Sequence, residues 1–414
     1  MRIAFFIDKF PILSETFILN QITGLIDRGY EVDIYCDRGG NRAEMHPAVE
    51  EYQLLQRTYS TFIPRNIILR CLKGIILFLL NFLKAPQTVL NSLTIKSGNS
   101  PYGDLADFLK PLYLTVPLLN KKPYDIIHCH YGRNGLKAVL LKDLGVIEGK
   151  IVVAFHGNDI SRYLKIHGDR IYDYLFERGD LFQPISQHWS KKLIALGCNP
   201  DKIVIHHMGI DCDKFMPPQD KNTDPEEILI VSIARLVEKK GLSYGIQAIA
   251  QLILQYPQLK LQYHLVGDGV LKQELTKQIE QLKMKDRVKL LGWKKQQEVR
   301  AIIDRADIVL APSVTSQEGD CEGIPVSLME AMAQAIPVVS TYHSGIPELV
   351  EDGVTGYLVP EKEVDSLQDK LDNLTNNFDL RQKMGRGGRA KVMQEFNIAL
   401  LCDRLSQIYQ ELVS

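Results

Sequence analysis

Short apolar runs alternate with segments of helical spacing along the chain, and this alternation constrains the fold more than any other feature. Each run has the length of a strand, and apolar residues in the following stretch recur every three or four positions. Strands separated by helices pair in parallel, and parallel sheets need helices on both faces. The pattern therefore predicts a doubly wound α/β architecture. The expected strands are 3–7, 32–35, 125–128, 151–155, 181–184, 202–205, 228–233, 261–266, 288–291, 308–310 and 337–339.

One break interrupts the pattern, the polar and proline-rich stretch MGIDCDKFMPPQDKNTDPEE that begins at Met208. It has no apolar periodicity and is typical of a linker. A chain of 414 residues is also too long for one ordinary core. We therefore predict an N-terminal domain over 1–209, a linker over 210–226 and a C-terminal domain over 227–396, with the domains facing a cleft. The amphipathic helix over about 397–414 either caps the second domain or packs back on the first.

The composition is that of a globular protein, with 45% hydrophobic and 24% charged residues. A formal net charge of −1 argues against a dedicated nucleic-acid binder, because such proteins normally carry a basic excess. Seven cysteines without a C-x-x-C pair offer no zinc or disulfide framework and fit a reducing cytosol. No signal peptide is evident, and no apolar run approaches the roughly 20 residues of a spanning helix. We expect a cytoplasmic protein.

The segment 52–103 contains no acidic residue, yet it holds six basic residues and the apolar run IILRCLKGIILFLLNFLKA. The six are Arg57, Arg65, Arg70, Lys73, Lys84 and Lys96. Two interpretations stay open. In one, the segment lies in a membrane interface with its cations on anionic headgroups, which would place the protein on the inner face of the cytoplasmic membrane. In the other, it is a helix buried against the core of its domain.

Ligands of open parallel sheets bind at the carboxyl ends of the strands, so the loops there are where chemistry is expected. After the strand 228–233, Arg235 and Lys240 precede a helix that Gly241 opens. A guanidinium fork combined with an ammonium suits a diphosphate. Exposed Arg and Lys residues are common, however, and alone this pair carries little weight.

Two further loops end in glycines. Gly267 and Gly269 flank Asp268 after the strand 261–266, where missing side chains would let backbone approach a ligand. This is a G-x-G without the third glycine, so it is weak as a dinucleotide fingerprint. Trp293 follows the next strand in LGW and is either a ligand contact or an ordinary surface or core aromatic.

The stretch DCEGIPVSLMEAM follows the strand DIVLAPS and places Glu322 and Gly323 before a helix. A helix start offers free backbone N–H groups and a positive dipole, which suit an anion. Glu330 lies eight positions on, a little over two turns down the helix. A carboxylate there can accept two hydrogen bonds from a vicinal diol such as a ribose. The competing explanation is an acidic helix start and a solvated glutamate.

Together these segments resemble family four of the retaining GT-B glycosyltransferases. EGIPVSLMEAM matches the family's E-x7-E element, and HGND, PISQHWSKKLIALG, MGID, ARLVEKKGL, VGDG, LGW and SGIPELVEDGVTGYLVP extend the match nearly end to end. FPILSETFI and DCEGIPVSLMEAMAQAIPVVSTYHSGIPELV are similar to the branch of colanic-acid and amylovoran exopolysaccharide enzymes. The resemblance implies a GT-B fold of two Rossmann-like domains and a nucleotide-sugar donor.

On the donor side, the resemblance implies that Arg235 and Lys240 hold the diphosphate and stabilise the leaving group. Glu330 would bind the nucleotide ribose. Glu322, with the backbone of 323–324, would touch the donor sugar and phosphate. The remaining donor-side candidates are Gly267, Asp268, Gly269, Trp293, Gly323, Ile324 and Pro325.

From the first domain, His156 in HGND would approach the donor sugar, and it joins Arg235, Lys240 and Glu322 as the predicted catalytic set. Many members carry a glycine-rich loop after the first strand, where this chain has PILSETF. Acceptor contacts therefore do not transfer simply from the family. The candidates for the acceptor side are Ser14, Glu15, Thr16, His130, Asp159 and Ser186.

Two patterns compete as metal sites. Asp211 and Asp213 spell the D-x-D motif that binds a metal in another glycosyltransferase fold, but they lie in the expected linker, where a turn explains them. His128 and His130 lie on one face of a strand without an evident third ligand, so we expect one of them to line the cleft instead. No metal and no cofactor are expected.

The implied reaction moves a sugar from a nucleotide donor, in our expectation a UDP-hexose, to a lipid-linked oligosaccharide with retention of configuration. No carboxylate nucleophile is evident, which favours a front-side route in which the departing diphosphate accepts the acceptor's proton. The alternatives are a nucleotide-sugar-binding protein without turnover and an enzyme with a soluble small acceptor. A dehydrogenase is disfavoured because no G-x-G-x-x-G follows the first strand of either domain.

Overall fold

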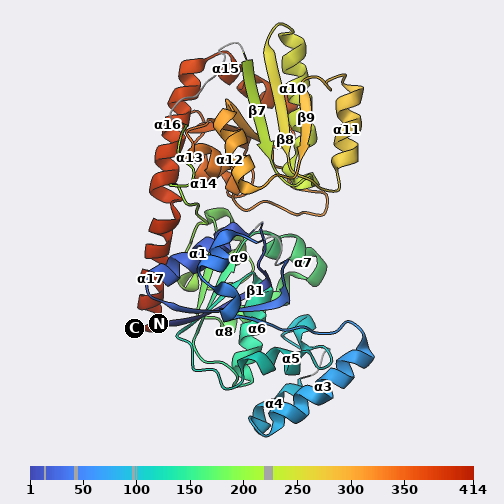
Figure 1. The fold of residues 1–414 in the computed structure, drawn as a ribbon, viewed down its shortest axis with the longest axis vertical. Helices are drawn as coiled ribbons and strands as arrows, with labels where there is room; N and C mark the ends of the chain where they lie inside the picture. The colour runs from blue at the N-terminus through green and yellow to red at the C-terminus, as the bar shows by residue number, and fades with distance from the viewer. Residues whose placement is uncertain (14, 42–44, 96–97, 99, 219–226) are drawn as a thin grey trace. The chain divides into compact units, whose positions relative to one another are not determined.

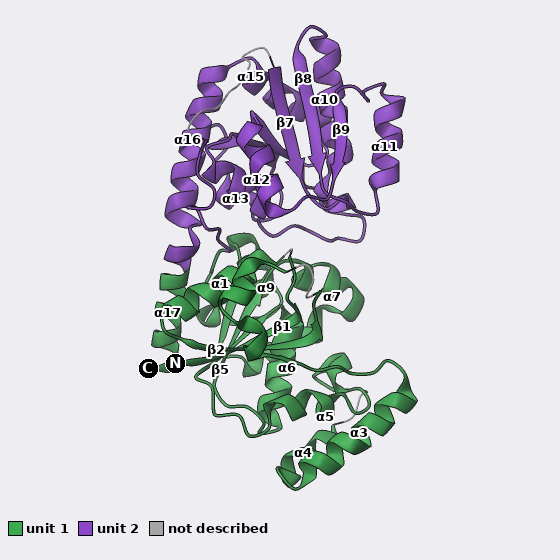
Figure 2. Ribbon diagram, viewed as in Figure 1, with its two compact units in different colours: residues 1–207, 402–414 green, residues 208–401 purple. Residues whose placement is uncertain are grey.

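The computed structural model describes residues 1–13, 15–41, 45–95, 98, 100–218 and 227–414. These residues form two compact units, one of 1–207 with 402–414 and the other of 208–401 (Figure 2). Each unit contains one parallel six-stranded sheet with helices packed on its faces (Figure 1). The predicted doubly wound α/β architecture is therefore confirmed.

In unit 1 the strand order is β3-β2-β1-β4-β5-β6. Its strands are β1 (Arg2–Phe10), β2 (Glu31–Gly39), β3 (Thr58–Ser60), β4 (Ile126–His130), β5 (Lys150–Phe155) and β6 (Leu181–Pro184). Ile3 lies beside Val32 of β2 and Ile126 of β4, and all three side chains are buried. Its helices are α1 (Thr16–Asp27), α2 (Pro47–Glu51), α3 (Ile67–Phe82), α4 (Pro86–Thr94), α5 (Lys110–Thr115), α6 (Gly132–Asp143), α7 (Arg162–His167), α8 (Asp173–Arg178) and α9 (Gln187–Ala195).

In unit 2 the strand order is β12-β11-β10-β7-β8-β9. Its strands are β7 (Glu227–Ile233), β8 (Lys260–Val266), β9 (Val288–Gly292), β10 (Ile308–Ala311), β11 (Val338–Thr341) and β12 (Gly356–Val359). Its helices are α10 (Leu242–Gln255), α11 (Lys272–Gln281), α12 (Gln296–Arg305), α13 (Val326–Ala333), α14 (Ile346–Leu349), α15 (Val364–Thr375) and α16 (Phe378–Glu395).

Both sheets have the strand order of a Rossmann fold, in which the chain starts in the middle and winds outward first to one side and then to the other. The direction of winding reverses between β1 and β4 in unit 1, and between β7 and β10 in unit 2. In such sheets ligands bind beyond the carboxyl ends of the strands at this switch point. The loops after these four strands are therefore the places to look for chemistry.

The structure corrects the predicted strands in three places. The segment 202–205 is not a strand, because a 3-10 turn (Pro200–Lys202) leads into a single bridge between Ile203 and Phe182. The short edge strands β3 and β12 were not predicted. Strand β3 has only three residues, too few for a period-two pattern to show.

The first half of the predicted linker packs on unit 2. Ile210, Cys212 and Phe215 are buried in the same apolar cluster as strands and helices of that unit. Ile210 also pairs with Asn397 in a parallel bridge. The boundary between the two units lies between residues 207 and 208.

The C-terminal helix α17 (Ile398–Val413) contributes its residues from Cys402 onward to unit 1. Arg28 Nε donates to Asp403 at 2.7 Å. Tyr409 is completely buried, and its hydroxyl lies 2.6 Å from His128 Nδ1. The end of the chain is thus part of the core of the first unit.

Helix α3, from the acid-free segment, is not buried against the core. Its apolar side chains, among them Ile68, Leu72 and Leu79, are largely exposed. The interpretation of a core helix is therefore wrong. Across the described residues, no helix combines the length and the apolar character needed to cross a membrane. Lys96, the last cation of the segment, lies outside the described residues.

Candidate active site

The loops after β7 and β10 meet at the switch point of unit 2. Lys240 lies at the end of the first loop and Glu322 near the end of the second. Lys240 Nζ donates to Glu322 Oε2 at 2.8 Å. Because parallel strands end at one edge of a sheet, two segments far apart in sequence come into direct contact here.

Glu322 is a buried carboxylate between two lysines. Besides Lys240, Lys239 Nζ lies 3.5 Å from Glu322 Oε1. Lys239 also donates to Asp320 at 3.1 Å and to the carbonyl of Cys321 at 3.2 Å. Burial alone would raise the pKa of the Glu322 carboxyl, but Lys240 and Lys239 outweigh it and hold the pKa at about 2. Glu322 is therefore ionised at neutral pH, and its Oε1 accepts no hydrogen bond from a described residue.

The backbone of Glu322 is held by two consecutive residues of the loop after β11. Its N–H donates to His343 Nε2 at 2.9 Å, and its carbonyl accepts from Ser344 Oγ at 2.7 Å. His343 Nδ1 in turn lies 2.5 Å from Glu361 Oε1. Glu361 also accepts the backbone N–H of Thr315 at 2.8 Å. These contacts fix both the position and the direction of the Glu322 loop.

Arg235 is exposed, and its guanidinium has no hydrogen bond or ion pair with a described residue. Its loop is joined to the G-x-G loop, because Leu236 N–H donates to the Asp268 carbonyl at 3.0 Å. Gly267 has a φ of +139°, and a Cβ there would lie 1.9 Å from the carbonyl oxygen of Ala234. Packing between two loops thus requires this glycine, whereas the sequence suggested the approach of a ligand as the reason.

Helix α13 carries Glu330. Gly323, Ile324 and Pro325 lead into the helix, with Ile324 buried in the unit's core and Pro325 as the N-cap. Glu330 is partly buried, and its carboxyl has no hydrogen-bond partner among the described residues. Burial raises the pKa of this carboxyl to about 8. A poorly hydrated carboxyl without a hydrogen-bond partner is costly, which is what a site awaiting hydroxyl groups would show.

The remaining donor-side candidates lie further out. Trp293 follows β9 and leaves 55% of its surface exposed. Asp268 accepts the backbone N–H of Gly269 at 2.8 Å and pairs with Lys272 at 2.9 Å, and both of these contacts are exposed. Nothing in their surroundings distinguishes these residues from an ordinary surface.

In unit 1, the buried His130 and the partly buried His156 form a pair at the ends of β4 and β5. His130 Nδ1 lies 2.9 Å from His156 Nε2, with the rings stacked at 5.1 Å. Burial lowers the pKa of His156 to about 3 and the pKa of His130 well below its ordinary value. Asp159 accepts the N–H groups of His156 and Gly157, at 3.0 and 2.9 Å, and of Gly132 at 3.1 Å. Both rings are therefore uncharged and rigidly placed.

Glu15 belongs to the same group of residues. Tyr131 Oη donates to Glu15 Oε1 at 3.1 Å, and the Tyr131 ring lies 4.7 Å from that of His156. Burial raises the pKa of the Glu15 carboxyl to about 7, against the hydrogen bond from Tyr131. Tyr131 has a φ of +71°, unusual for a residue with a side chain. Thr16 begins α1, and Ser14 lies outside the described residues.

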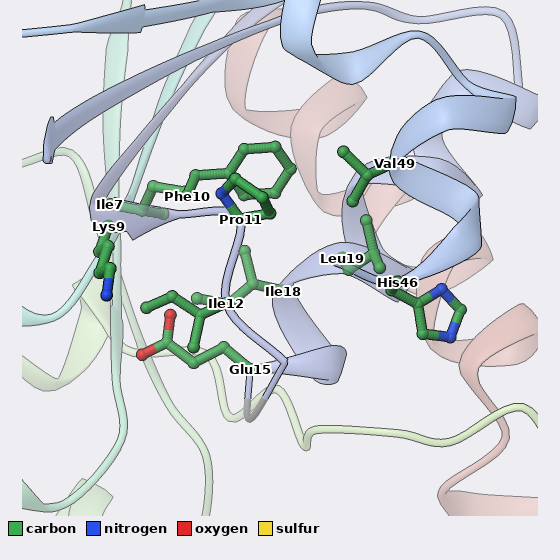
Figure 3. A pocket seen from close by; sticks show the side chains of 10 residues that line it. All are labelled: Ile7, Lys9, Phe10, Pro11, Ile12, Glu15, Ile18, Leu19, His46 and Val49. Carbon is green, nitrogen blue, oxygen red and sulfur yellow. The ribbon is translucent and has the colours of Figure 1, made fainter. Parts of the chain in front are cut away.

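A small pocket lies behind Glu15 (Figure 3). Its volume of about 10 Å³ is enough for roughly one water molecule and too small for a sugar. Lys9 and Glu15 bring charged groups to an otherwise mostly apolar lining. The lining residues are Ile7, Lys9, Phe10, Pro11, Ile12, Glu15, Ile18, Leu19, His46 and Val49.

Two sets of residues have local structural roles. Ser186 is fully buried, and its hydroxyl caps α9 by accepting the N–H of Trp189 at 3.3 Å. Asp211 accepts the backbone N–H groups of Asp213 and Lys214, at 3.1 and 3.3 Å, which explains D-x-D as a turn. The described contacts of Ser186 and Asp211 thus hold backbone in place.

Comparison with known proteins identifies the family. The model of Glycosyltransferase Family 4 matches residues 14–214, and that of Glycosyl transferases group 1 matches residues 214–391. A putative colanic acid biosynthesis glycosyltransferase from Salmonella typhimurium is 38% identical, over 99% of this chain and 100% of the relative. This chain belongs to family four of the glycosyltransferases. The resemblance drawn from its motifs is confirmed.

Other proteins similar to this chain are also glycosyltransferases or share its fold. An amylovoran biosynthesis glycosyltransferase from Erwinia amylovora is 39% identical over the whole of both chains. A UDP-Gal:alpha-D-GlcNAc-diphosphoundecaprenol alpha-1,3-galactosyltransferase from Escherichia coli is 26% identical over 74% of this chain and 80% of the relative. The crystal structure of Anabaena HepE with UDP and glucose matches with a TM-score of 0.73 and 18% identity, covering 99% of this chain and all of HepE. This likeness shows the GT-B fold.

Sequence reasoning about this glycosyltransferase predicted Lys240 and Glu322 but missed the residues that hold Glu322 in place. Lys239, His343, Ser344 and Glu361 were not among the predicted residues. The repeated lysine of EKKG was a visible signal for Lys239. The other three became evident only from the contacts between loops.

Proposed function

We propose that this glycosyltransferase moves a sugar from a UDP-linked donor to a lipid-linked oligosaccharide in exopolysaccharide biosynthesis, with retention of configuration. The observation that carries the proposal is the ionised Glu322 between Lys239 and Lys240, with the unpartnered carboxyl of Glu330 in the second turn of α13. Cations suit a diphosphate, and a carboxylate suits a diol.

In this proposal the donor lies on unit 2. Arg235, exposed and without a protein partner, binds the diphosphate together with Lys240. Glu330 accepts the two ribose hydroxyls. Glu322 accepts a hydrogen bond from a hydroxyl of the donor sugar through Oε1, which accepts no hydrogen bond from a described residue. The backbone N–H groups that precede α13 add positive potential at the phosphate.

The chemical step follows from this arrangement. The bond between the anomeric carbon and the diphosphate oxygen breaks, and the acceptor oxygen bonds to the same face of the sugar. The acceptor's proton passes to an oxygen of the departing diphosphate, so no protein base is required. Arg235 and Lys240 stabilise the negative charge that develops on the diphosphate.

The acceptor side of the proposal rests on unit 1 and on relatives. The Escherichia coli relative acts, by its name, on a saccharide carried by diphosphoundecaprenol. Glu15, which lies in the loop after β1, would contact the acceptor, and His156, which follows β5, would approach the donor sugar. Both present groups that hydrogen-bond without a fixed charge. An acceptor on a lipid also requires the enzyme to work at a bilayer surface.

Purified protein incubated with a panel of UDP- and GDP-sugars and a lipid-linked acceptor tests the proposal. Release of UDP and NMR of the new linkage report the donor and the stereochemistry. We expect an α-linkage from an α-linked UDP donor. A β-linkage would overturn the front-side route, and tight UDP binding without turnover would indicate a binding protein.

A further inference from the structure

Helices α3 and α4 present an apolar face that nothing in the described chain covers. Of the 24 large apolar side chains exposed across the described residues, 12 lie between Phe62 and Leu93. On α3 the exposed ones recur with helical spacing at Ile68, Leu72, Ile75 and Leu79. Soluble monomers rarely expose a contiguous patch of this kind, so the face marks an interaction surface.

The orientation of α3 is fixed by its small and polar residues, which face inward. A Cβ at Gly74 would lie 2.9 Å from the Leu109 side chain, so the glycine permits close packing on this side. The carbonyl of Arg70 accepts from Tyr113 Oη at 2.7 Å. Helices α3, α4 and α5 pack on one another within unit 1 (Figure 1). The helix is thus amphipathic, but its apolar stripe faces outward, whereas the apolar stripe of a core helix faces inward.

Charge indicates what covers this face. Residues 52–103 contain no carboxylate, and Arg65 and Lys84 are exposed just beyond the two ends of α3. A second copy placed face to face would bring these cations together without any acid of the segment to neutralise them. An anionic surface would neutralise them all. At about 1.5 Å per residue, the 16 residues of α3 span about 24 Å, less than a bilayer core of about 30 Å.

We propose that α3 and α4 form an interfacial anchor, with the axis of α3 in the plane of an anionic bilayer and its apolar stripe among the upper acyl chains. This surface deepens the proposed function, because it brings unit 1 to lipid-linked acceptors, but its evidence does not depend on the chemistry of unit 2.

Co-sedimentation with vesicles of phosphatidylcholine alone, or mixed with phosphatidylglycerol, tests the anchor. The wild type should bind the anionic vesicles, and binding should weaken with salt. The triple variant Ile68→Asn, Ile75→Asn and Leu79→Asn should lose binding to both compositions. The double variant Leu254→Asn and Val270→Asn is a matched control on exposed apolar residues of unit 2, and it should bind like the wild type.

The cations are tested separately. Arg65→Gln with Lys84→Gln should lower binding to the anionic vesicles by about fivefold per residue and leave any weak binding to neutral vesicles unchanged. These two are preferable to Arg70 and Lys73, whose side chains donate to the carbonyls of Pro64 and Phe62 and so support the fold.

Two results would overturn the anchor. One is a wild type that does not sediment with anionic vesicles. The other is a wild-type dimer that the triple variant converts to a monomer, because this would show a second copy on the face. UDP binding by calorimetry should be the same in all variants, so a failed anchor and a failed donor site are told apart.

A second, independent observation concerns the protonation of His343. A backbone N–H can only donate, so His343 Nε2, which receives the N–H of Glu322, must be unprotonated. The ring proton therefore lies on Nδ1 and is donated to Glu361. Ser344, the next residue, has a φ of +50° and donates its hydroxyl to the Glu322 carbonyl. Two adjacent side chains thus hold both backbone groups of one residue.

We infer that His343 is a positioning residue for the donor site, acting through the backbone of Glu322 rather than by touching substrate. The side chain of His343 is 1% exposed, so it can support the Glu322 loop but cannot contact a substrate directly. Its partner Glu361 also binds Thr315, which ties the start of the same loop to its end. This inference rests on the proposed role of Glu322 in binding the donor.

Two conservative variants separate the roles of the ring nitrogens. His343→Gln places an amide oxygen near the Nε2 position and can still accept the Glu322 N–H, whereas His343→Asn reaches only the Nδ1 position. We expect His343→Gln to keep UDP affinity and turnover within a few-fold of the wild type. His343→Asn should lose about tenfold in UDP affinity, because a buried N–H is left without an acceptor.

If His343→Asn does not fold, Ser344→Ala provides the second measurement, since it removes one of the two backbone contacts and keeps the imidazole. It should weaken UDP binding by a smaller factor. Equal UDP affinity in the wild type, His343→Asn and Ser344→Ala would overturn the positioning role. A wild type that binds no nucleotide would instead overturn the proposed donor site.

Discussion

Both units place ionisable groups in loops after the strands of a Rossmann-like sheet, but the pKa values of these groups shift in opposite ways. In unit 2, burial of Glu322 is offset by Lys239 and Lys240, and its pKa falls to about 2. In unit 1, no opposite charge offsets the burial of Glu15 and His156. Burial favours the neutral form of each, with pKa values of about 7 and about 3.

This difference teaches which kind of ligand each group of residues is suited to bind. A site with paired and fixed charges stabilises an anion, because its dipoles and ions do not reorganise when the ligand arrives. A site of neutral, buried donors and acceptors recognises hydroxyl groups, which need hydrogen bonds without a strong field. Under the proposed function, the same scaffold would bind a diphosphate in unit 2 and sugar hydroxyls in unit 1.

The charged half should be the more sensitive to mutation. Arg235→Ala and Lys240→Ala should each cost about 2–4 kcal/mol of transition-state stabilisation, as the loss of one preorganised group does. Lys240→Ala should also lower the melting temperature, because Glu322 then keeps only one lysine. Arg235→Ala should not, since its side chain is exposed and unpaired among the described residues. Kinetics and thermal unfolding measure both, and an Arg235→Ala enzyme with normal turnover would contradict the assignment.

Glu330 is the exception within unit 2, because it is buried without a cation. Its folded-state pKa of about 8 lies above its ordinary value of 4.5, so the folded protein binds the extra proton and stability should fall as pH rises from about 4.5 to 8. Glu330→Gln should remove this fall and be the more stable protein at pH 8.

Above pH 8, where Glu330 is ionised, the same substitution should weaken UDP binding by about tenfold, because an amide accepts hydrogen bonds less strongly than a carboxylate. Thermal unfolding between pH 5 and 8 and calorimetry with UDP check the two effects. Unchanged UDP affinity in Glu330→Gln would remove this residue from the donor site.

In unit 1, ionisation of Glu15 should also lower the stability of the protein as pH rises, but over a lower pH range than that of Glu330. Its folded-state pKa is about 7, so its contribution to stability should decline as pH rises from about 4.5 to 7 and then level off. Glu15→Gln should flatten the profile. Tyr131→Phe should extend the decline to higher pH, since it removes a donor to the carboxylate. A Tyr131→Phe profile that ends at lower pH would show that the hydrogen bond favours the protonated acid.

The smallest effect should come from removal of divalent ions. In the proposed site, Arg235, Lys240 and the start of α13 would supply the positive potential at the diphosphate, so EDTA should leave turnover unchanged. Loss of activity in EDTA that manganese restores would contradict this account of the charged half and direct attention back to Asp211 and Asp213.

The sequence by itself determined the architecture and supplied the candidates for the proposed donor site. Strand and helix periods are local properties, so alternation along the chain indicated both sheets, missing only the edge strands β3 and β12. Arg235 and Glu322 could be singled out because residues that follow strands in parallel sheets gather at one edge, and the resemblance to the family supplied the proposed roles of these two and of Glu330.

Only the tertiary structure decided which groups share contacts and which faces are covered. His343 and Ser344 hold Glu322 across 21 and 22 residues of intervening chain, and nothing local marks them. For α3, amphipathic spacing showed that its apolar residues share a face but not whether that face is buried. Gly74 and Tyr113 decide which side of α3 faces unit 1. A helix packs on the side where its neighbours leave room for it, and α3 packs where Gly74 has no side chain and Tyr113 donates to its backbone.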